Sequence, residues 1–472
     1  NYKVRQKKEL PSPTPAPPDP EPLFLTPWIK NCSYEVARNK SKLDIFKTFG
    51  VTANAYSGYI TVNETTESNL FFVFIEAENN DTNAPLMLWT PGGPGLPSLL
   101  SLFLQNGPVE INATGGFSRR KLTIQEKMSV IYLDVPVGAG FSFTQNASGY
   151  ATSIEDVRKD IKEFLQQFLQ LFDKYQGRDF YAGGDSYAAR FSVDLAYDML
   201  SCPGDVNLTF QGTIGGVGFL APVLDLADSS DFLLQTSMLT PEGHKTFKER
   251  FDEMRNLTAL GNRTIYPYVL SLLFQTIFTA GPNGTKTLFQ NLTLYNSHAS
   301  PLYTERPVSM LQSFGVADQP LFKASIHAGM NNTLEYANKT LLTMLALDWL
   351  IDITPKVEYV LNNTRVLFYN GQLDALFPSA NSQAYFEKLN WTHAEEYRNA
   401  SRGLWKPYGD YIWPFGKQGP PVPISAAGYT KSAGNFTSAV VLGMGHYAGF
   451  DKPDEIYHLI MQFLAKNISF SS

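Results

Sequence analysis

Cysteine is nearly absent from this chain, which has only Cys32 and Cys202 among its 472 residues. Its stability must therefore come from a packed core and not from a network of disulfides. In an oxidising compartment the two thiols could close one disulfide that spans most of the N-terminal half, and two buried free thiols are the less favoured alternative. Histidine is also scarce, with six residues, and no His or Cys pair has the spacing of metal ligands. The sequence therefore predicts no metal site.

Long apolar runs and strong charge are missing as well. No stretch of 18 apolar residues occurs, which excludes a typical transmembrane helix. Charged residues make up 17% of the chain and the net charge is −6, so we expect no nucleic acid partner. No signal peptide is visible, and we interpret the numbering as starting after its removal.

What is abundant is the acceptor motif for N-linked glycans. The chain contains 18 Asn-x-Ser/Thr sequons, whereas its composition would supply only about four by chance. This excess favours a glycoprotein of the secretory pathway. The candidate acceptors are Asn31, Asn39, Asn63, Asn80, Asn112, Asn146, Asn207, Asn256, Asn262, Asn283, Asn291, Asn331, Asn338, Asn362, Asn390, Asn399, Asn435 and Asn467.

The order of apolar segments predicts an α/β protein. Residues 1–22 are polar and then rich in proline, so we expect a flexible N-terminal arm. After it, strand patterns alternate with an amphipathic helix, which is typical of a mostly parallel sheet covered by helices on both faces. The predicted strands are 56–62 and 70–75, which form a hairpin, then 84–89, 128–133, the short run 180–181, 210–220, 365–371 and 438–443, and the predicted helices are 153–172 and 453–464.

The pattern changes between residues 225 and 344, where helix-like pieces at 254–260 and 269–278 replace the strands. We interpret this stretch as a cap inserted into the sheet domain, which would then consist of residues 23–224 and 345–472.

One short stretch carries the chemistry. Gly184-Asp-Ser-Tyr-Ala188 follows a predicted strand and opens a helix-compatible segment. Small residues on both sides of a serine are typical of a nucleophile elbow, the sharp strand-to-helix turn that exposes Ser186 Oγ. The motif alone is not specific, because serine lies between small residues in many loops.

Two later strands end in partners for this serine. Asp374 follows the strand 365–371, and His446 follows the strand 438–443. The order Ser186, Asp374, His446 is that of α/β-hydrolases. In such a triad the histidine takes the serine proton and the aspartate orients and stabilises the imidazole. For the other five histidines, surface or core roles suffice.

An oxyanion hole requires two backbone N–H groups near the nucleophile. Tyr187 directly follows Ser186, and its N–H is one candidate. The glycine loop after the strand 84–89 supplies Gly93 as the other. This loop is not a phosphate loop, because no Gly-Lys-Ser/Thr follows it.

Together these segments resemble the serine carboxypeptidases, and most of all their vitellogenic-like branch. The likeness spans residues 22 to 465 and rests on Trp89-x-x-Gly-Gly-Pro-Gly95, Asp134-Val-Pro-Val-Gly-Ala-Gly-Phe-Ser142, Gly184-Asp-Ser-Tyr-Ala188, Asn370-Gly-x-x-Asp374 and Gly445-His446. It implies an α/β-hydrolase fold with an inserted cap and no cofactor. It also implies removal of C-terminal residues from peptides in lysosomes or secretions, usually at acidic pH, and in many relatives a homodimer.

The resemblance also implies a site for the substrate's terminal carboxylate, with Trp89, Gly92, Gln105 and Asp185 at its positions. Here the chain departs from the family. Pro91 stands where the family has an asparagine, and Gln105 and Asp185 stand where it has glutamates. Proline cannot donate a hydrogen bond to a carboxylate, whereas a glutamine side chain donates one at any pH and a glutamate only when it is protonated. We therefore expect an altered carboxylate site and activity that extends towards neutral pH.

Three functions fit these residues. The first is a carboxypeptidase that acts on peptide or protein C-termini. The second is an esterase or acyltransferase on the same scaffold, for which the altered carboxylate site would reflect a substrate without a carboxylate. The third is a catalytically impaired secreted glycoprotein that acts by binding, against which the complete triad argues.

Overall fold

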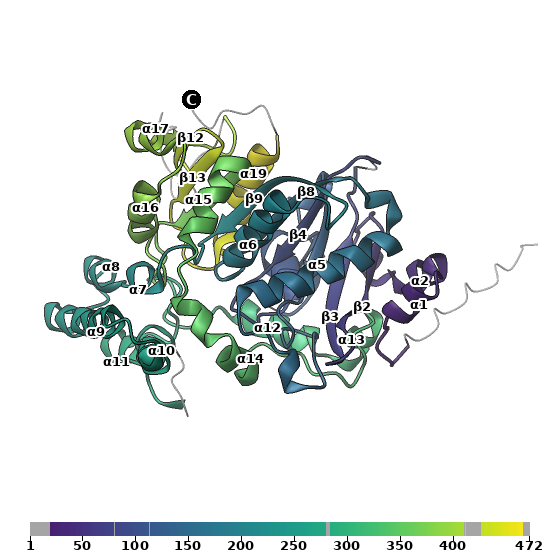
Figure 1. The fold of residues 1–472 in the computed structure, drawn as a ribbon, viewed down its shortest axis with the longest axis horizontal. Helices are drawn as coiled ribbons and strands as arrows, with labels where there is room; N and C mark the ends of the chain where they lie inside the picture. The colour runs from purple at the N-terminus through teal and green to yellow at the C-terminus, as the bar shows by residue number, and fades with distance from the viewer. Residues whose placement is uncertain are drawn as a thin grey trace, which may run out of the picture.

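The computed structural model of the protein describes residues 19–79, 81–112, 114–279, 284–409, 411 and 426–465. Within these ranges an 11-stranded sheet runs through the molecule (Figure 1). Its strands, in spatial order, are β1 (Lys42–Leu43), β2 (Ala55–Asn63), β3 (Ser68–Ile75), β7 (Ser129–Leu133), β4 (Leu86–Thr90), β8 (Asp179–Asp185), β9 (Thr209–Gly216), β10 (Arg365–Gly371), β13 (Phe436–Val441), β12 (Gly428–Ala433) and β11 (Gly403–Trp405). A separate two-stranded sheet pairs β5 (Val109–Ile111) with β6 (Phe117–Arg119).

The centre of the large sheet is parallel. The six strands from β7 to β13 pair in parallel, and antiparallel strands extend the sheet at both edges. All residues of β4 and β7 are buried, because helices cover both faces of a parallel sheet and leave its strands no polar side. The α/β architecture predicted from the sequence is confirmed.

Two apolar cores lie on opposite faces of this sheet. One face is covered by α5 and α6, which cross it side by side (Figure 1), and the other by α19. The helix predicted for 153–172 is confirmed as α5, whose N-terminus is capped by Ser153 Oγ accepting from the Asp156 N–H at 3.2 Å. The helices packed around the sheet are α1 (Thr26–Lys30), α2 (Tyr34–Ser41), α3 (Ile45–Thr48), α4 (Ser98–Leu100), α5 (Ile154–Leu171), α6 (Ala188–Ser201), α15 (Thr354–Asn363), α16 (Ser379–Lys388), α17 (Ala394–Asn399), α18 (Ala448–Asp451) and α19 (Pro453–Leu464).

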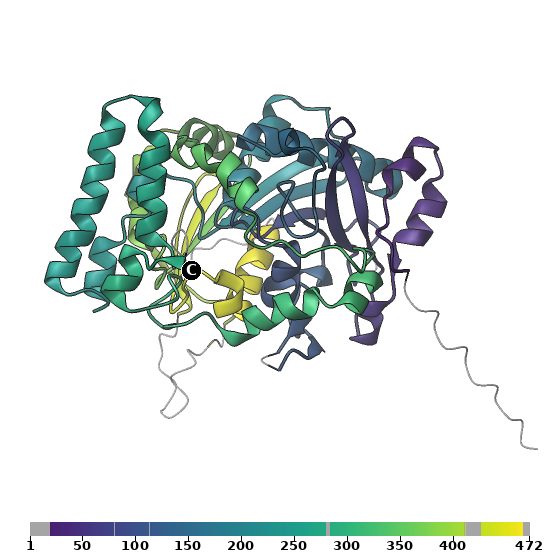
Figure 2. The same ribbon diagram turned by 90° about the horizontal axis from the view of Figure 1, so that it is seen from below.

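The chain between β9 and β10 forms a helical insertion. Figure 2 shows its longest helices, α9 and α10, as a neighbouring pair beyond one edge of the sheet. The sequence predicted only the last third of α9. Its earlier turns are rich in charged residues, and Phe247 and Phe251 are the only large apolar side chains that they bury. Its helices before α15 are α7 (Val223–Leu226), α8 (Ser230–Gln235), α9 (Pro241–Ala259), α10 (Tyr266–Ile277), α11 (Leu288–Thr293), α12 (Val308–Ala317), α13 (Pro320–Ser325) and α14 (Lys339–Met344).

The two cysteines and the end of the N-terminal arm lie at the surface. Cys32 and Cys202 are free and exposed, so the candidate disulfide is not formed; one thiol lies in the turn after α1 and the other at the end of α6. Residues 1–18 of the predicted arm lie outside the described ranges. Its last residues make contacts, since the Met330 N–H donates to the Pro20 carbonyl at 2.7 Å. No helix among the described residues has the length and apolar character needed to cross a bilayer.

The sequon asparagines within the described ranges are exposed, with Asn338 as the exception. Asn338 is half-buried, its Oδ1 caps α14, and its Nδ2 donates to the Gly138 carbonyl at 3.2 Å. Because a glycan attaches to Nδ2, this engagement argues against glycosylation at Asn338. Asn80, Asn283 and Asn467 lie outside the described residues.

Candidate active site

The predicted elbow lies between β8 and α6. Ser186 adopts a left-handed backbone conformation, with φ of 60°, which is rare for a residue other than glycine. The turn tolerates only small neighbours, because a Cβ on Gly184 would lie 2.5 Å from the Ala188 Cβ and 2.6 Å from the Thr90 carbonyl oxygen. The Ser186 N–H donates to the Gly216 carbonyl at 2.7 Å, which ties the turn to β9. The strain of this turn is of the kind that exposes a nucleophilic hydroxyl.

The structure brings Ser186, Asp374 and His446 together. Each follows the carboxyl end of a parallel strand, β8, β10 or β13, and these ends meet at one edge of the sheet. His446 Nε2 lies 3.0 Å from Ser186 Oγ, and His446 Nδ1 lies 2.9 Å from Asp374 Oδ2. The histidine therefore bridges a hydroxyl and a carboxylate at hydrogen-bond distance, the arrangement that general base catalysis requires.

Asp374 is held rigidly in this arrangement. Its side chain is fully buried, and its Oδ1 accepts hydrogen bonds from the N–H groups of Leu376 and Phe377, each at 2.9 Å. Burial alone would lower the pKa of His446, but the charge and hydrogen bond of Asp374 outweigh it and raise that pKa. The carboxylate thus stabilises an imidazolium at this position.

The glycine loop after β4 lies against the elbow. A Cβ on Gly92 would stand 2.3 Å from the Asp185 carbonyl oxygen and 3.1 Å from the Tyr187 amide nitrogen, so only glycine permits this approach. Neither the Gly93 N–H nor the Tyr187 N–H is among the bonded backbone donors of the described residues. The Tyr187 N–H directly follows Ser186 and the Gly93 N–H directly follows Gly92, so both stay candidates for the oxyanion hole.

The predicted carboxylate-binding residues form one connected group. Gln105 Nε2 donates to Asp185 Oδ2 at 2.9 Å, and the Tyr369 hydroxyl donates to Asp185 Oδ1 at 2.6 Å. Burial raises the pKa of Asp185 to about 6, and these two donors and His446 oppose the shift. Trp89 is 1% exposed and packs in the core behind the loop, so it supports the site and offers little surface to a substrate.

Sequence reasoning missed two residues that shape this region. Tyr369 lies in the middle of a buried strand, where a tyrosine is indistinguishable from core. Asp134 is fully buried, and its carboxylate accepts from the Ser98 N–H at 2.6 Å and the Phe141 N–H at 2.7 Å. It therefore joins the segment after the glycine loop to residues 137–142. Its place in the motif Asp134–Ser142 was visible, but not its role.

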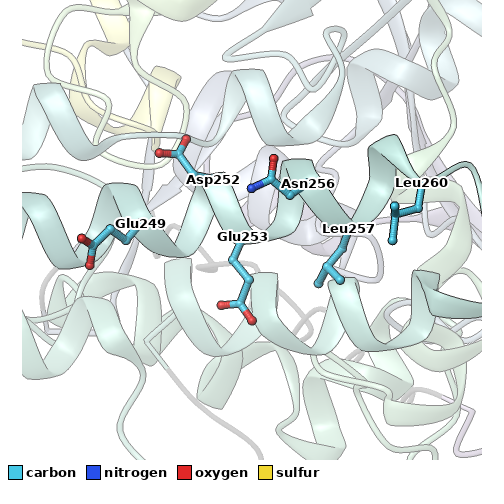
Figure 3. A pocket seen from close by; sticks show the side chains of 6 residues that line it. All are labelled: Glu249, Asp252, Glu253, Asn256, Leu257 and Leu260. Atoms are coloured by element: carbon cyan, nitrogen blue, oxygen red, sulfur yellow. The ribbon is translucent and has the colours of Figure 1, made fainter.

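Away from this site, the described residues show a hollow on the insertion but no second triad of this kind. A surface hollow lies along α9 of the insertion (Figure 3), and no serine or histidine lines it. It is lined by Glu249, Asp252, Glu253, Asn256, Leu257 and Leu260. Among the described residues, no group of His, Cys, Asp or Glu is arranged to hold a metal ion.

Comparisons with known proteins agree on one family. The sequence profile described as serine carboxypeptidase matches residues 46–466. The chain is 30% identical over 446 residues to the probable serine carboxypeptidase CPVL of Homo sapiens, covering 94% of this chain and 89% of that protein. It is also 30% identical over 448 residues to the venom serine carboxypeptidase of Apis mellifera, covering 94% of this chain and 90% of that protein. For the vitellogenic carboxypeptidase of Aedes aegypti the identity is 30% over 451 residues, with the same two coverages.

The fold has a solved counterpart in the prohormone-processing carboxypeptidase Kex1 of Saccharomyces cerevisiae. The TM-score is 0.71 at 16% identity, and the match covers 92% of this chain and 97% of that one. This likeness supports the α/β-hydrolase fold. With the profile covering most of the sequence, the chain belongs to the serine carboxypeptidase family.

Proposed function

We propose that this protein releases C-terminal residues from peptides through an acyl-enzyme formed on Ser186. The observation that supports this best is His446, which lies within hydrogen-bond distance of both Ser186 and Asp374. With its Nδ1 proton donated to Asp374, the histidine presents a free Nε2 lone pair to the Ser186 hydroxyl.

In the proposed reaction, Ser186 Oγ attacks the carbonyl carbon of the scissile bond while His446 takes the hydroxyl proton. The developing oxyanion accepts hydrogen bonds from the N–H groups of Gly93 and Tyr187. His446 then donates its proton to the leaving nitrogen, the C–N bond breaks, and water releases the acyl group by the same steps in reverse order.

Release of a single C-terminal residue also requires recognition of its carboxylate. The altered group around Asp185 affects this step, because Pro91 supplies no N–H and Gln105 already donates one hydrogen bond to Asp185. When Asp185 ionises it repels a substrate carboxylate, so we infer that binding of free C-termini weakens above about pH 6. This is the physical basis for an acidic working range that reaches towards neutral pH.

We further propose that residues 225–344 form a cap beside the site and that the protein passes through the secretory pathway as a glycoprotein, to be secreted or to act in lysosomes. The exposed sequon asparagines support glycosylation, since a glycosyltransferase needs access to Nδ2.

Hydrolysis of N-blocked dipeptides tests the proposed function. Wild type should cleave a dipeptide with a free C-terminus and Ser186→Ala should not, with both proteins unfolding at the same temperature. Cleavage of simple esters without cleavage of any free-acid dipeptide would favour the esterase or acyltransferase function, for which Pro91 is the supporting observation.

A further inference from the structure

A loop of the insertion is packed against the loop that carries His446. This loop, residues 296–306, is called here the docked loop; it closes on itself through the Asn296 N–H, which donates to the Thr304 carbonyl at 2.7 Å. The His446 N–H donates to the Ala299 carbonyl at 2.9 Å, and the Tyr303 hydroxyl donates to Asp451 Oδ1 at 2.9 Å. The insertion therefore contributes directly to the surroundings of the histidine.

The docked loop ends in a cation beside the site. Arg306 is exposed and forms none of the ion pairs found among the described residues. The side chain of Arg306 forms a hydrogen bond with the Tyr447 side chain. Burial raises the pKa of Tyr447, and this hydrogen bond and the positive charge of Arg306 oppose the increase. Tyr447 directly follows His446, and its ring centroid lies 6.4 Å from that of Tyr303.

His298, in the same loop, stays neutral. Burial lowers its pKa to about 3, with further contributions from the positive charges of Arg306 and His446. Its buried Nδ1 has no hydrogen-bond partner within the described part of the chain. The junction thus holds an unpartnered polar atom and a cation without a counter-ion, and both observations point to a ligand that the protein alone does not supply.

His446 indicates on which side of Ser186 the leaving residue binds. Because its Nε2 must protonate the leaving nitrogen, the leaving residue lies on the His446 side of Ser186. The loop after His446 then reaches Gln105, since a Cβ on Gly449 would lie 3.1 Å from the Gln105 Cβ. The loop of residues 446–449 therefore contacts the docked loop at His446 and Gln105 at Gly449, and the space that receives the leaving residue adjoins this loop.

Among the described residues, the charged groups that act on Tyr447 are Arg306 and Asp451. Asp185 and Asp451 are carboxylates whose oxygens accept from protein donors, Tyr369 and Gln105 for the first and the Gly445 N–H and Tyr303 for the second. Neither attracts an anion. A leaving residue with a carboxylate would find a counter-charge at Arg306, the cation that acts on Tyr447.

We propose that Arg306, held beside Tyr447 by the docked loop, is a specificity-determining residue that binds a carboxylate of the leaving residue. The inference rests on the proposed function and deepens it, because it adds a cation of the insertion to the altered group around Asp185 in carboxylate recognition. A guanidinium binds a carboxylate with two parallel hydrogen bonds and keeps its charge at every working pH. The carboxylate is either the terminal one or that of an acidic C-terminal side chain.

The test measures binding without turnover, by calorimetry on a Ser186→Ala background. Three N-blocked dipeptides serve as probes: Phe-Leu with a free C-terminus, its C-terminal amide, and Phe-Glu amide, which carries only a side-chain carboxylate. At least one carboxylate-bearing probe should bind about fivefold or more tighter than Phe-Leu amide. Adding Arg306→Gln should remove this preference, and Arg306→Lys should keep part of it. Arg263→Gln, at another exposed arginine of the insertion, is the control and should change nothing.

The probe that responds identifies the source of the carboxylate. Equal weakening of all three probes by Arg306→Gln would overturn the proposal, because it would indicate a structural role for the arginine. An unchanged preference, or no preference in the first place, would overturn it as well. Failure of the proposed function gives a different result, because wild type would then bind the dipeptides in calorimetry but would not cleave them in the hydrolysis assay.

Discussion

Replacement of Tyr369 by phenylalanine should move the pH range in which free C-termini are bound. In the wild type, the Tyr369 hydroxyl donates to Asp185 Oδ1 at 2.6 Å and so favours the ionised carboxylate. A hydrogen bond to a charged group is worth about 1.5–3 kcal/mol, which corresponds to about one to two pH units in the titration of Asp185. The pKa of Asp185, already raised to about 6 by burial, should therefore rise further in Tyr369→Phe.

The assay is KM as a function of pH for one N-blocked dipeptide with a free C-terminus and for its amide. For the free acid, KM should increase above about pH 6 in wild type, and this increase should begin about one to two pH units higher in Tyr369→Phe. The amide carries no charge at its C-terminus, so its KM should not follow Asp185. Tyr59→Phe is the matched control, because that buried hydroxyl donates to the Ala328 carbonyl at 2.8 Å, away from Asp185.

A shift of the free-acid profile towards lower pH would refute the reasoning, and so would the same shift in both substrates. The second result would mean that the hydroxyl acts on His446 or on the fold and not on the charge that meets the substrate carboxylate.

Three further predictions address the loop, the triad and the fold. Gly92→Ala should lower kcat at least about tenfold, because its Cβ would stand 2.3 Å from the Asp185 carbonyl; Gly177→Ala, with φ of 72° and open space around it, should leave kcat unchanged. Asp374→Asn should lower kcat by about 10⁴ without loss of folded protein in thermal unfolding, and a fall below tenfold would exclude its role. Asp160→Asn should stabilise the protein by about 2 kcal/mol near pH 7.5 and hardly at pH 4. Burial raises the pKa of Asp160 to about 7, and Asp156 adds to the shift, so its ionisation costs stability as pH rises from about 4 to 7; urea unfolding at the two pH values checks this.

The parts of the site that follow strand ends could be predicted from the sequence. Glycines around Ser186 and near His446 mark turns, and apolar runs before them mark buried strands. Since the carboxyl ends of parallel strands share one edge, the order of these motifs was enough to predict that Ser186, Asp374 and His446 converge. The shape of the elbow is similarly encoded, because a side chain at Gly184 would lie 2.5 Å from the Ala188 Cβ.

Contacts between distant segments could not be predicted where no glycine turn or apolar run points to them. Tyr369 looks like core until β10 is aligned beside β9 and its hydroxyl reaches Asp185. The docked loop has no apolar period or turn motif that connects it to His446, and its role depends on how the insertion folds back on the sheet. Most of α9 was missed because it packs through a narrow apolar stripe on an otherwise charged helix.

The central claim is that Ser186 is a nucleophile activated by His446 and Asp374, and covalent labelling with a fluorophosphonate tests it most directly. Wild type should be labelled at Ser186 alone, with labelling lost in Ser186→Ala and slowed at least a hundredfold in His446→Ala. A folded wild-type protein that is not labelled, or a His446→Ala variant labelled at the wild-type rate, would contradict the claim.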